Sequence, residues 1–119
     1  MADNKFTAIP NEIWTLKKLE VLNIAKNKLQ NLSGKVNNLI QLRELNMCNN
    51  QLQNLPVEIW ALHTLRILSL NGNDLTSLSD EIKNLKNLED LRLNKNQLTD
   101  LPQGLWSLSK LRMLHMNDN

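Results

Sequence analysis

The sequence predicts an α/β solenoid, with a curved parallel β-sheet on the concave side and helical or 3₁₀ turns on the convex side. The first observation is a leucine that recurs every 23 residues, at Leu16, Leu39, Leu62, Leu85 and Leu108. The second is an asparagine with the same period, at Asn4, Asn27, Asn50, Asn73, Asn96 and Asn119. Self-similarity at such a period is the signature of stacked repeats, none of which can bury its apolar side chains alone.

The chain is expected to form one continuous array, because no linker or charge block divides residues 1–119. A partial repeat at residues 1–15 matches the second half of the later repeats, and a truncated repeat occupies residues 108–119. The full repeats are residues 16–38, 39–61, 62–84 and 85–107. Neither end shows the polar cap that closes the core of a solenoid. We therefore expect a piece of a longer array or self-association through uncapped ends.

Each repeat has two halves with different periodicity. In residues 85–107, leucine alternates with polar residues around Leu91, which predicts a short strand. Leu98, Leu101 and Leu105 follow at spacings of three and four residues, which suits a helical or 3₁₀ turn. Prolines stand near the start of three such turns, at Pro10, Pro56 and Pro102. A missing N–H is harmless there.

The repeated asparagine comes at the bend after each predicted strand. Its amide both donates and accepts hydrogen bonds, so a column of asparagines can satisfy the backbone groups that the bend leaves unpaired. We interpret all six asparagines as a structural ladder.

The strand half and the asparagine together form the pattern LxxLxLxxNxL, which residues 88–98 match as LEDLRLNKNQL. In this pattern the chain resembles the leucine-rich repeat (LRR) family, and its 23-residue period resembles the intracellular Ras-suppressor and Scribble-like subtype. The resemblance covers nearly the whole chain. It implies an LRR solenoid and a scaffold or adaptor role, and it does not name the partner.

The register predicts which side chains point out of the concave sheet. Neighbouring parallel strands lie about 4.8 Å apart, so equivalent residues form stripes across the sheet. The first stripe is Val21, Glu44, Ile67, Asp90 and Met113, and the second is Asn23, Asn46, Ser69, Arg92 and His115. Single apolar residues beside fixed charges suit a protein-binding surface, although a merely solvated face is the alternative. A row just before the strands, Glu20, Arg43, Arg66, Glu89 and Arg112, favours charge pairing between neighbouring repeats.

Three tryptophans, Trp14, Trp60 and Trp106, occupy one position in alternate repeats, on the predicted convex side. We expect their rings to cover apolar surface on the outer ridge. The alternative is a convex contact surface with aromatic anchors, since tryptophan is enriched at binding hot spots.

The sequence contains no motif for nucleotide binding, nucleophilic catalysis or metal ligation. Ser69 and His115 lie two predicted strands apart, roughly 10 Å, which is beyond hydrogen-bond reach. His63, His115 and Cys48 are dispersed and do not form a metal site. We therefore predict no enzyme activity and no cofactor.

Composition excludes other partner classes. The net charge is +2 and the basic residues are scattered, so the sequence favours neither nucleic acid nor a membrane as a partner. The N-terminus lacks the features of a signal peptide, and one cysteine cannot form an internal disulfide. Both points favour a cytoplasmic location, including that of a secreted effector in a host cytosol. A glycosylation sequon at Asn31 leaves extracellular adhesion as a weaker alternative.

These observations predict a non-enzymatic protein–protein interaction module that binds a protein on its concave face. The alternative is the targeting region of a larger enzyme or bacterial effector, with its activity outside this segment.

Overall fold

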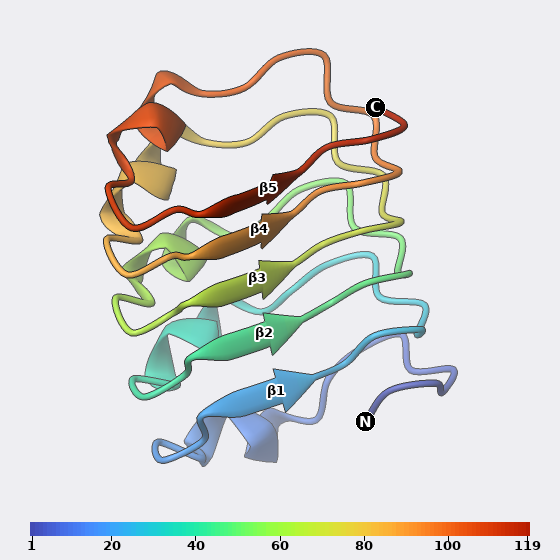
Figure 1. Ribbon diagram of the computed structural model, residues 1–119. Helices are drawn as coiled ribbons and strands as arrows, with labels where there is room; N and C mark the ends of the chain where they lie inside the picture. Colours follow the sequence, from blue (N-terminus) through green and yellow to red (C-terminus); the bar gives the residue numbers. More distant parts are fainter.

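The computed structural model describes residues 1–119 and confirms the predicted solenoid. Five parallel strands form one sheet in the order β1-β2-β3-β4-β5, so each strand pairs with the strand of the next repeat (Figure 1). The strands are β1 (Val21–Asn23), β2 (Glu44–Asn46), β3 (Ile67–Ser69), β4 (Asp90–Arg92) and β5 (Met113–His115).

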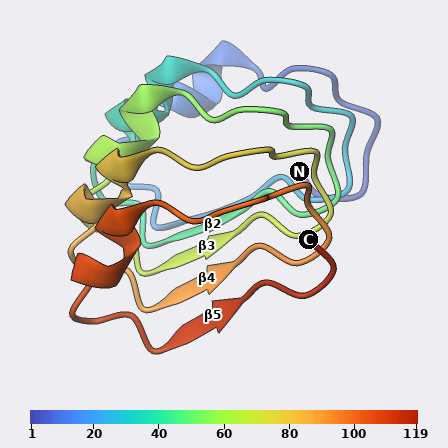
Figure 2. The same ribbon diagram turned by 90° about the horizontal axis from the view of Figure 1, so that it is seen from above.

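Five short helices lie on the side opposite the sheet (Figure 2). They are η1 (Asn11–Thr15), η2 (Gly34–Asn38), η3 (Val57–Ala61), η4 (Asp80–Asn84) and η5 (Gln103–Ser107). All five are 3₁₀ helices, which decides between the two predicted turn types. Each has room for only five residues, a length at which the tighter i→i+3 turn is common.

The residue before each helix is a proline or a serine. Pro10, Pro56 and Pro102 precede η1, η3 and η5, where the missing N–H leaves no hydrogen bond unmade. In the other two repeats Ser33 and Ser79 accept hydrogen bonds from backbone N–H groups of η2 and η4. The two solutions alternate along the chain, and both define where a helix begins.

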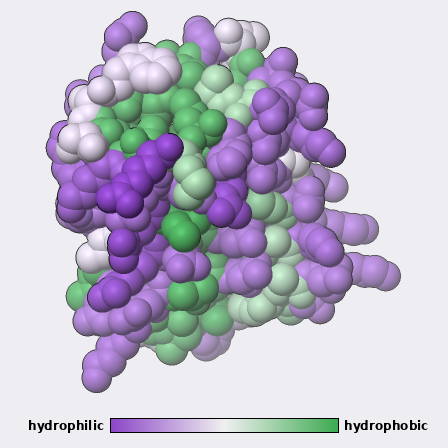
Figure 3. Space-filling view, in the orientation of Figure 1, coloured by the Kyte–Doolittle hydropathy of each residue, from purple (hydrophilic) through white to green (hydrophobic).

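The core lies between the sheet and the helices and is continuous through the array. It contains 26 buried residues, which include the central leucine of strands β1 to β4: Leu22, Leu45, Leu68 and Leu91. Hydrophobic surface gathers at the C-terminal end, at the top of Figure 3. None of the helices has the length and apolar character that a membrane crossing requires.

The asparagine column joins neighbouring repeats. Asn73 accepts a hydrogen bond from the N–H of Leu52, and its Nδ2 donates to the carbonyls of Met47 and Leu70, at 2.9–3.1 Å. Four members are buried: Asn27, Asn50, Asn73 and Asn96. Asn4 and Asn119, at the two ends, are exposed.

The residue before each of these asparagines has a positive φ. The six positions are Asp3, Lys26, Asn49, Gly72, Lys95 and Asp118, with φ between 54° and 66°. Glycine adopts this conformation at no steric cost and asparagine and aspartate tolerate it, whereas Lys26 and Lys95 are strained in it. The bend therefore takes priority over local backbone preference.

The expectation of a convex tryptophan ridge is wrong for Trp14 and Trp60. These rings are only 2% and 3% exposed and belong to the apolar core. Trp60 also borders a small hollow together with Leu55 of its own repeat and Leu78 of the next. Trp106 lies in η5, the last helix of the structure, and is 64% exposed. The shared repeat position thus gives two buried rings and one exposed ring.

Candidate functional site

The outward face of the sheet, called the concave face below, brings the predicted stripes together. The strand register places Val21 beside Glu44, Glu44 beside Ile67, and so on through Met113. The second stripe runs in the same way through Asn23, Asn46, Ser69, Arg92 and His115. Each stripe is therefore a continuous row of neighbours.

Two members of these stripes are not accessible, contrary to the expectation of an exposed row. Asp90 is 1% exposed and Ser69 is 3% exposed. Asp90 Oδ2 accepts hydrogen bonds from Arg92 Nη2 at 2.6 Å and Nε at 2.9 Å, so the guanidinium lies against the carboxylate. A partner could reach Arg92 but not Asp90.

Asp90 also faces His115 on β5. His115 Nε2 lies 3.7 Å from Asp90 Oδ1, an oxygen that is buried and accepts no hydrogen bond. Hydrogen bonding to Asp90 raises the pKa of Arg92. The C-terminal half of the concave face is thus a charge network whose members bind one another.

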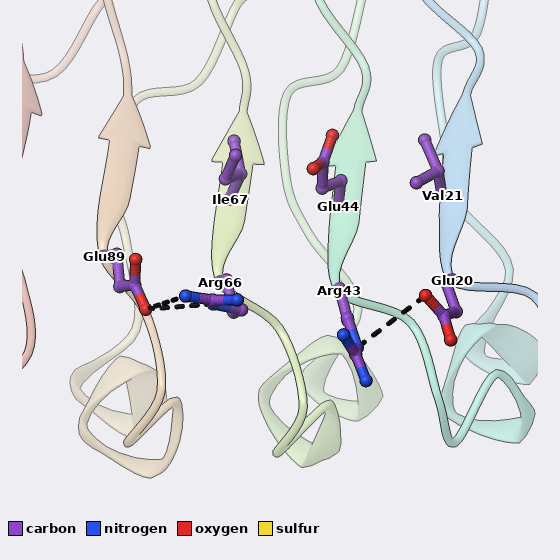
Figure 4. Close-up of a pocket in the computed structure, with 7 residues that line it drawn as sticks. All are labelled: Glu20, Val21, Arg43, Glu44, Arg66, Ile67 and Glu89. Atoms are coloured by element: carbon purple, nitrogen blue, oxygen red, sulfur yellow. Dashed lines mark hydrogen bonds and ion pairs between the residues drawn. The ribbon is translucent and has the colours of Figure 1, made fainter.

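The N-terminal half of the concave face is more open. A hollow of about 370 Å³ spans β1 to β3 and reaches the start of β4. It is lined by Glu20, Val21, Arg43, Glu44, Arg66, Ile67 and Glu89 (Figure 4). We call this set the β1–β3 hollow.

Two ion pairs border the β1–β3 hollow at the N-terminal ends of the strands (Figure 4). Arg66 donates from Nε and Nη2 to Glu89 Oε1, at 2.9 and 2.8 Å. Arg43 lies 3.9 Å from Glu20, with both side chains more than half exposed. The predicted charge pairing between neighbouring repeats is therefore tight in one pair and loose in the other.

At the exit of the strands, asparagines stabilise the backbone. Asn23 and Asn46 accept hydrogen bonds from the N–H groups of Ala25 and Cys48. Further along the array, Asn71 accepts from the N–H of Asn94, and Asn94 accepts from the N–H of Asn117. This second amide ladder was not predicted, because it joins only the last three repeats. Asn23 and Asn46, predicted as contact residues, already serve the backbone.

Cys48 lies half-buried beside this ladder. Burial raises the pKa of its thiol, opposed by a hydrogen bond from the Asn71 backbone and by the charge of Arg92. The thiol is therefore mostly protonated at neutral pH and is a poor nucleophile. No group of three or more His, Cys, Asp or Glu side chains is placed to hold a metal ion.

The fold and the concave face together define a solenoid of short parallel repeats with an open, charged sheet. The family described as leucine rich repeat matches residues 17–75 and 63–119, which together cover most of the chain. The chain therefore belongs to the leucine-rich repeat family. The comparison with curated proteins found no match.

Solved structures of similar proteins support this assignment. The LRR protein LIC12759 of Leptospira interrogans is 33% identical with a TM-score of 0.81, over 98% of this chain and 36% of that one. The LRR ectodomain of the Arabidopsis thaliana receptor kinase GASSHO1/SCHENGEN3 is 38% identical with a TM-score of 0.85, over 92% of this chain and 14% of that one. The LRR ectodomain of the Arabidopsis thaliana receptor kinase SOBIR1 is 28% identical with a TM-score of 0.84, over 100% of this chain and 68% of that one. The chain thus spans well under half of the first two.

LRR domains generally mediate protein–protein interactions, and the LRR fold is typically a non-enzymatic interaction module. The GASSHO1/SCHENGEN3 ectodomain was solved in complex with CASPARIAN STRIP INTEGRITY FACTOR 2. Binding of a protein partner is accordingly the general activity of the class to which this chain belongs.

Proposed function

We propose that this chain is a non-enzymatic scaffold or adaptor module that binds a protein partner on its concave face. The observation that carries the proposal is the exposed apolar side chains on that face. Val21 is 54% exposed and Met113 is 49% exposed, on a sheet that also carries fixed charges. Apolar contacts beside charges that orient the partner are the usual composition of a protein-binding surface.

Accessibility narrows the proposed contact residues. Val21, Asn23, Glu44, Arg92 and Met113 are exposed, and Asn46, Ile67 and His115 are partly exposed. Asp90 and Ser69 act beneath this surface, where Asp90 holds Arg92 in place. A partner would therefore contact the stripes around these two buried residues.

We place the module in the cytoplasm, among the Ras-suppressor and Scribble-like repeats. The 23-residue period and the single half-buried cysteine support this assignment. An extracellular role would instead use the exposed sequon residue Asn31, whose glycosylation in a secretory host is the corresponding test.

The test is affinity capture from a cell extract followed by quantitative mass spectrometry. The concave variant carries Val21→Arg and Met113→Arg. The matched control carries Ile40→Arg and Val57→Arg, which change two similarly exposed apolar residues away from the concave face. We expect the concave variant to lose a protein that both the wild type and the control retain. Equal capture by all three chains would contradict the proposal.

A second candidate function is the targeting region of a larger enzyme or bacterial effector. It is favoured by the similarity to the LRR ectodomains of two receptor kinases. In that case the concave face selects the target and the chemistry lies in another domain. The reading frame around the coding segment tests this, since it would continue into a region of different composition.

A further inference from the structure

The β1–β3 hollow contains three carboxylates, of which one has no partner. Glu20 faces Arg43, and Glu89 accepts both hydrogen bonds from Arg66. The Glu44 carboxylate takes part in none of the ion pairs of the chain. It is therefore the one carboxylate of this hollow without an ion-pair partner.

The neighbouring arginines are directed away from Glu44. Figure 4 shows the Arg43 and Glu44 side chains pointing in opposite directions along β2, and Arg66 turned towards Glu89. Arg92, two strands away on β4, is near enough for the charge of Glu44 to contribute to its raised pKa, but its guanidinium is hydrogen-bonded to Asp90 at 2.6 Å rather than to Glu44. The negative charge of Glu44 therefore stays available to an incoming group.

Glu44 is also flanked by apolar side chains. The register places Val21 on one side and Ile67 on the other, each on an adjacent strand about 4.8 Å away. A carboxylate between two aliphatic groups suits a lysine or arginine, because these side chains pack a long apolar stem beneath a charged end. An acidic or purely apolar group would leave either the charge or the apolar contacts unmatched.

We propose that the β1–β3 hollow receives a lysine or arginine side chain of a protein segment, with its stem against Val21 and Ile67 and its cation on Glu44. This inference rests on the proposed function, since it names the partner chemistry for the concave face. A partner would therefore present an exposed basic residue at the centre of its contact segment.

The test is selection of binders from a displayed library of random dodecapeptides. The targets are the wild type, Glu44→Gln, Glu44→Lys and the concave variant. The matched control is Glu12→Lys, which makes the same change of charge at an exposed position of helix η1. All these substitutions are at exposed positions, and circular dichroism verifies that each chain is folded.

We expect wild-type binders to share one lysine or arginine position, and Glu12→Lys to select the same peptides. Glu44→Gln should weaken a representative peptide about two- to fivefold, as expected for loss of an exposed charge pair, and Glu44→Lys should weaken it further. The concave variant should lose these peptides altogether.

Three results would overturn the inference, and they are distinguishable. Peptides that the concave variant loses, but that lack a basic residue or tolerate Glu44→Gln, would refute the basic partner and leave the concave face as the binding surface. Enrichment of acidic residues would do the same and would point to Arg43. Selection of no peptide sensitive to the concave variant would count against the proposed function as well.

Discussion

Replacement of Asn73 by alanine tests the account of the asparagine column. The Asn73 side chain makes three buried hydrogen bonds, one accepted from Leu52 N–H and two donated to the carbonyls of Met47 and Leu70. The two carbonyls also accept bonds from the amides of Asn50 and Asn96. Only the Leu52 N–H is therefore left without a partner in Asn73→Ala.

The magnitude follows from these contacts. A buried N–H without a partner costs about 1–3 kcal/mol, and each carbonyl that loses one of two donors costs about 0.5–1 kcal/mol. We expect Asn73→Ala to lower the free energy of unfolding by about 2–5 kcal/mol. Asn73→Asp should cost at least as much, because it aims an oxygen at two carbonyls.

Urea unfolding followed by far-UV circular dichroism measures this loss. The matched control is Asn4→Ala, at the same repeat position but exposed, where the side chain only donates to Met1 and Ala2. We expect the control to change stability by less than about 0.5 kcal/mol. A loss below about 1 kcal/mol in Asn73→Ala, or equal losses in both chains, would refute the reasoning.

Three further predictions concern the hydrogen bond from Gly104 to Asp80, the bend before the asparagine column and the ends of the array. The pKa of Asp80 is lowered because its carboxylate accepts a hydrogen bond from the N–H of Gly104 and faces Lys83. Its contribution to the free energy of unfolding is therefore present above the unfolded pKa and is lost as pH falls through the folded pKa. Acid titration of Asp80→Asn should show a smaller loss of stability over that pH window than the wild type does. Lys95→Gly should raise the free energy of unfolding by about 0.5–1 kcal/mol, because φ is 55° there, and no gain in urea unfolding would argue against strain at the bend. Light scattering should show an average molecular mass that rises with protein concentration, and Trp106→Lys should reduce this rise because it replaces an exposed apolar ring by a charge. A monomer at high concentration would count against self-association through the ends.

The sequence was sufficient to predict the solenoid and the strand register. Both follow from the 23-residue period, which places equivalent residues side by side in every repeat. The repeat position alone was not sufficient to predict burial. Trp60 is buried in the core, and Trp106, at the same position, is exposed in the last helix.

On the concave face, too, the sequence was sufficient to predict the neighbours of each residue but not its accessibility. The register placed Asp90 and Arg92 in their stripes correctly, because side chains alternate along a strand. It could not show that Arg92 folds back over Asp90, since that depends on the rotamer of a long side chain and on the charge two residues away. The period determines neighbours, whereas accessibility depends on side-chain packing.

Site-specific photo-crosslinking tests the central claim most directly. A photoreactive residue at Val21, on the concave face, is compared with one at Val57, an exposed residue of helix η3. After irradiation in a cell extract, we expect a discrete cross-linked protein from position 21 and none from position 57. The same product from position 57, without one from position 21, would contradict binding on the concave face.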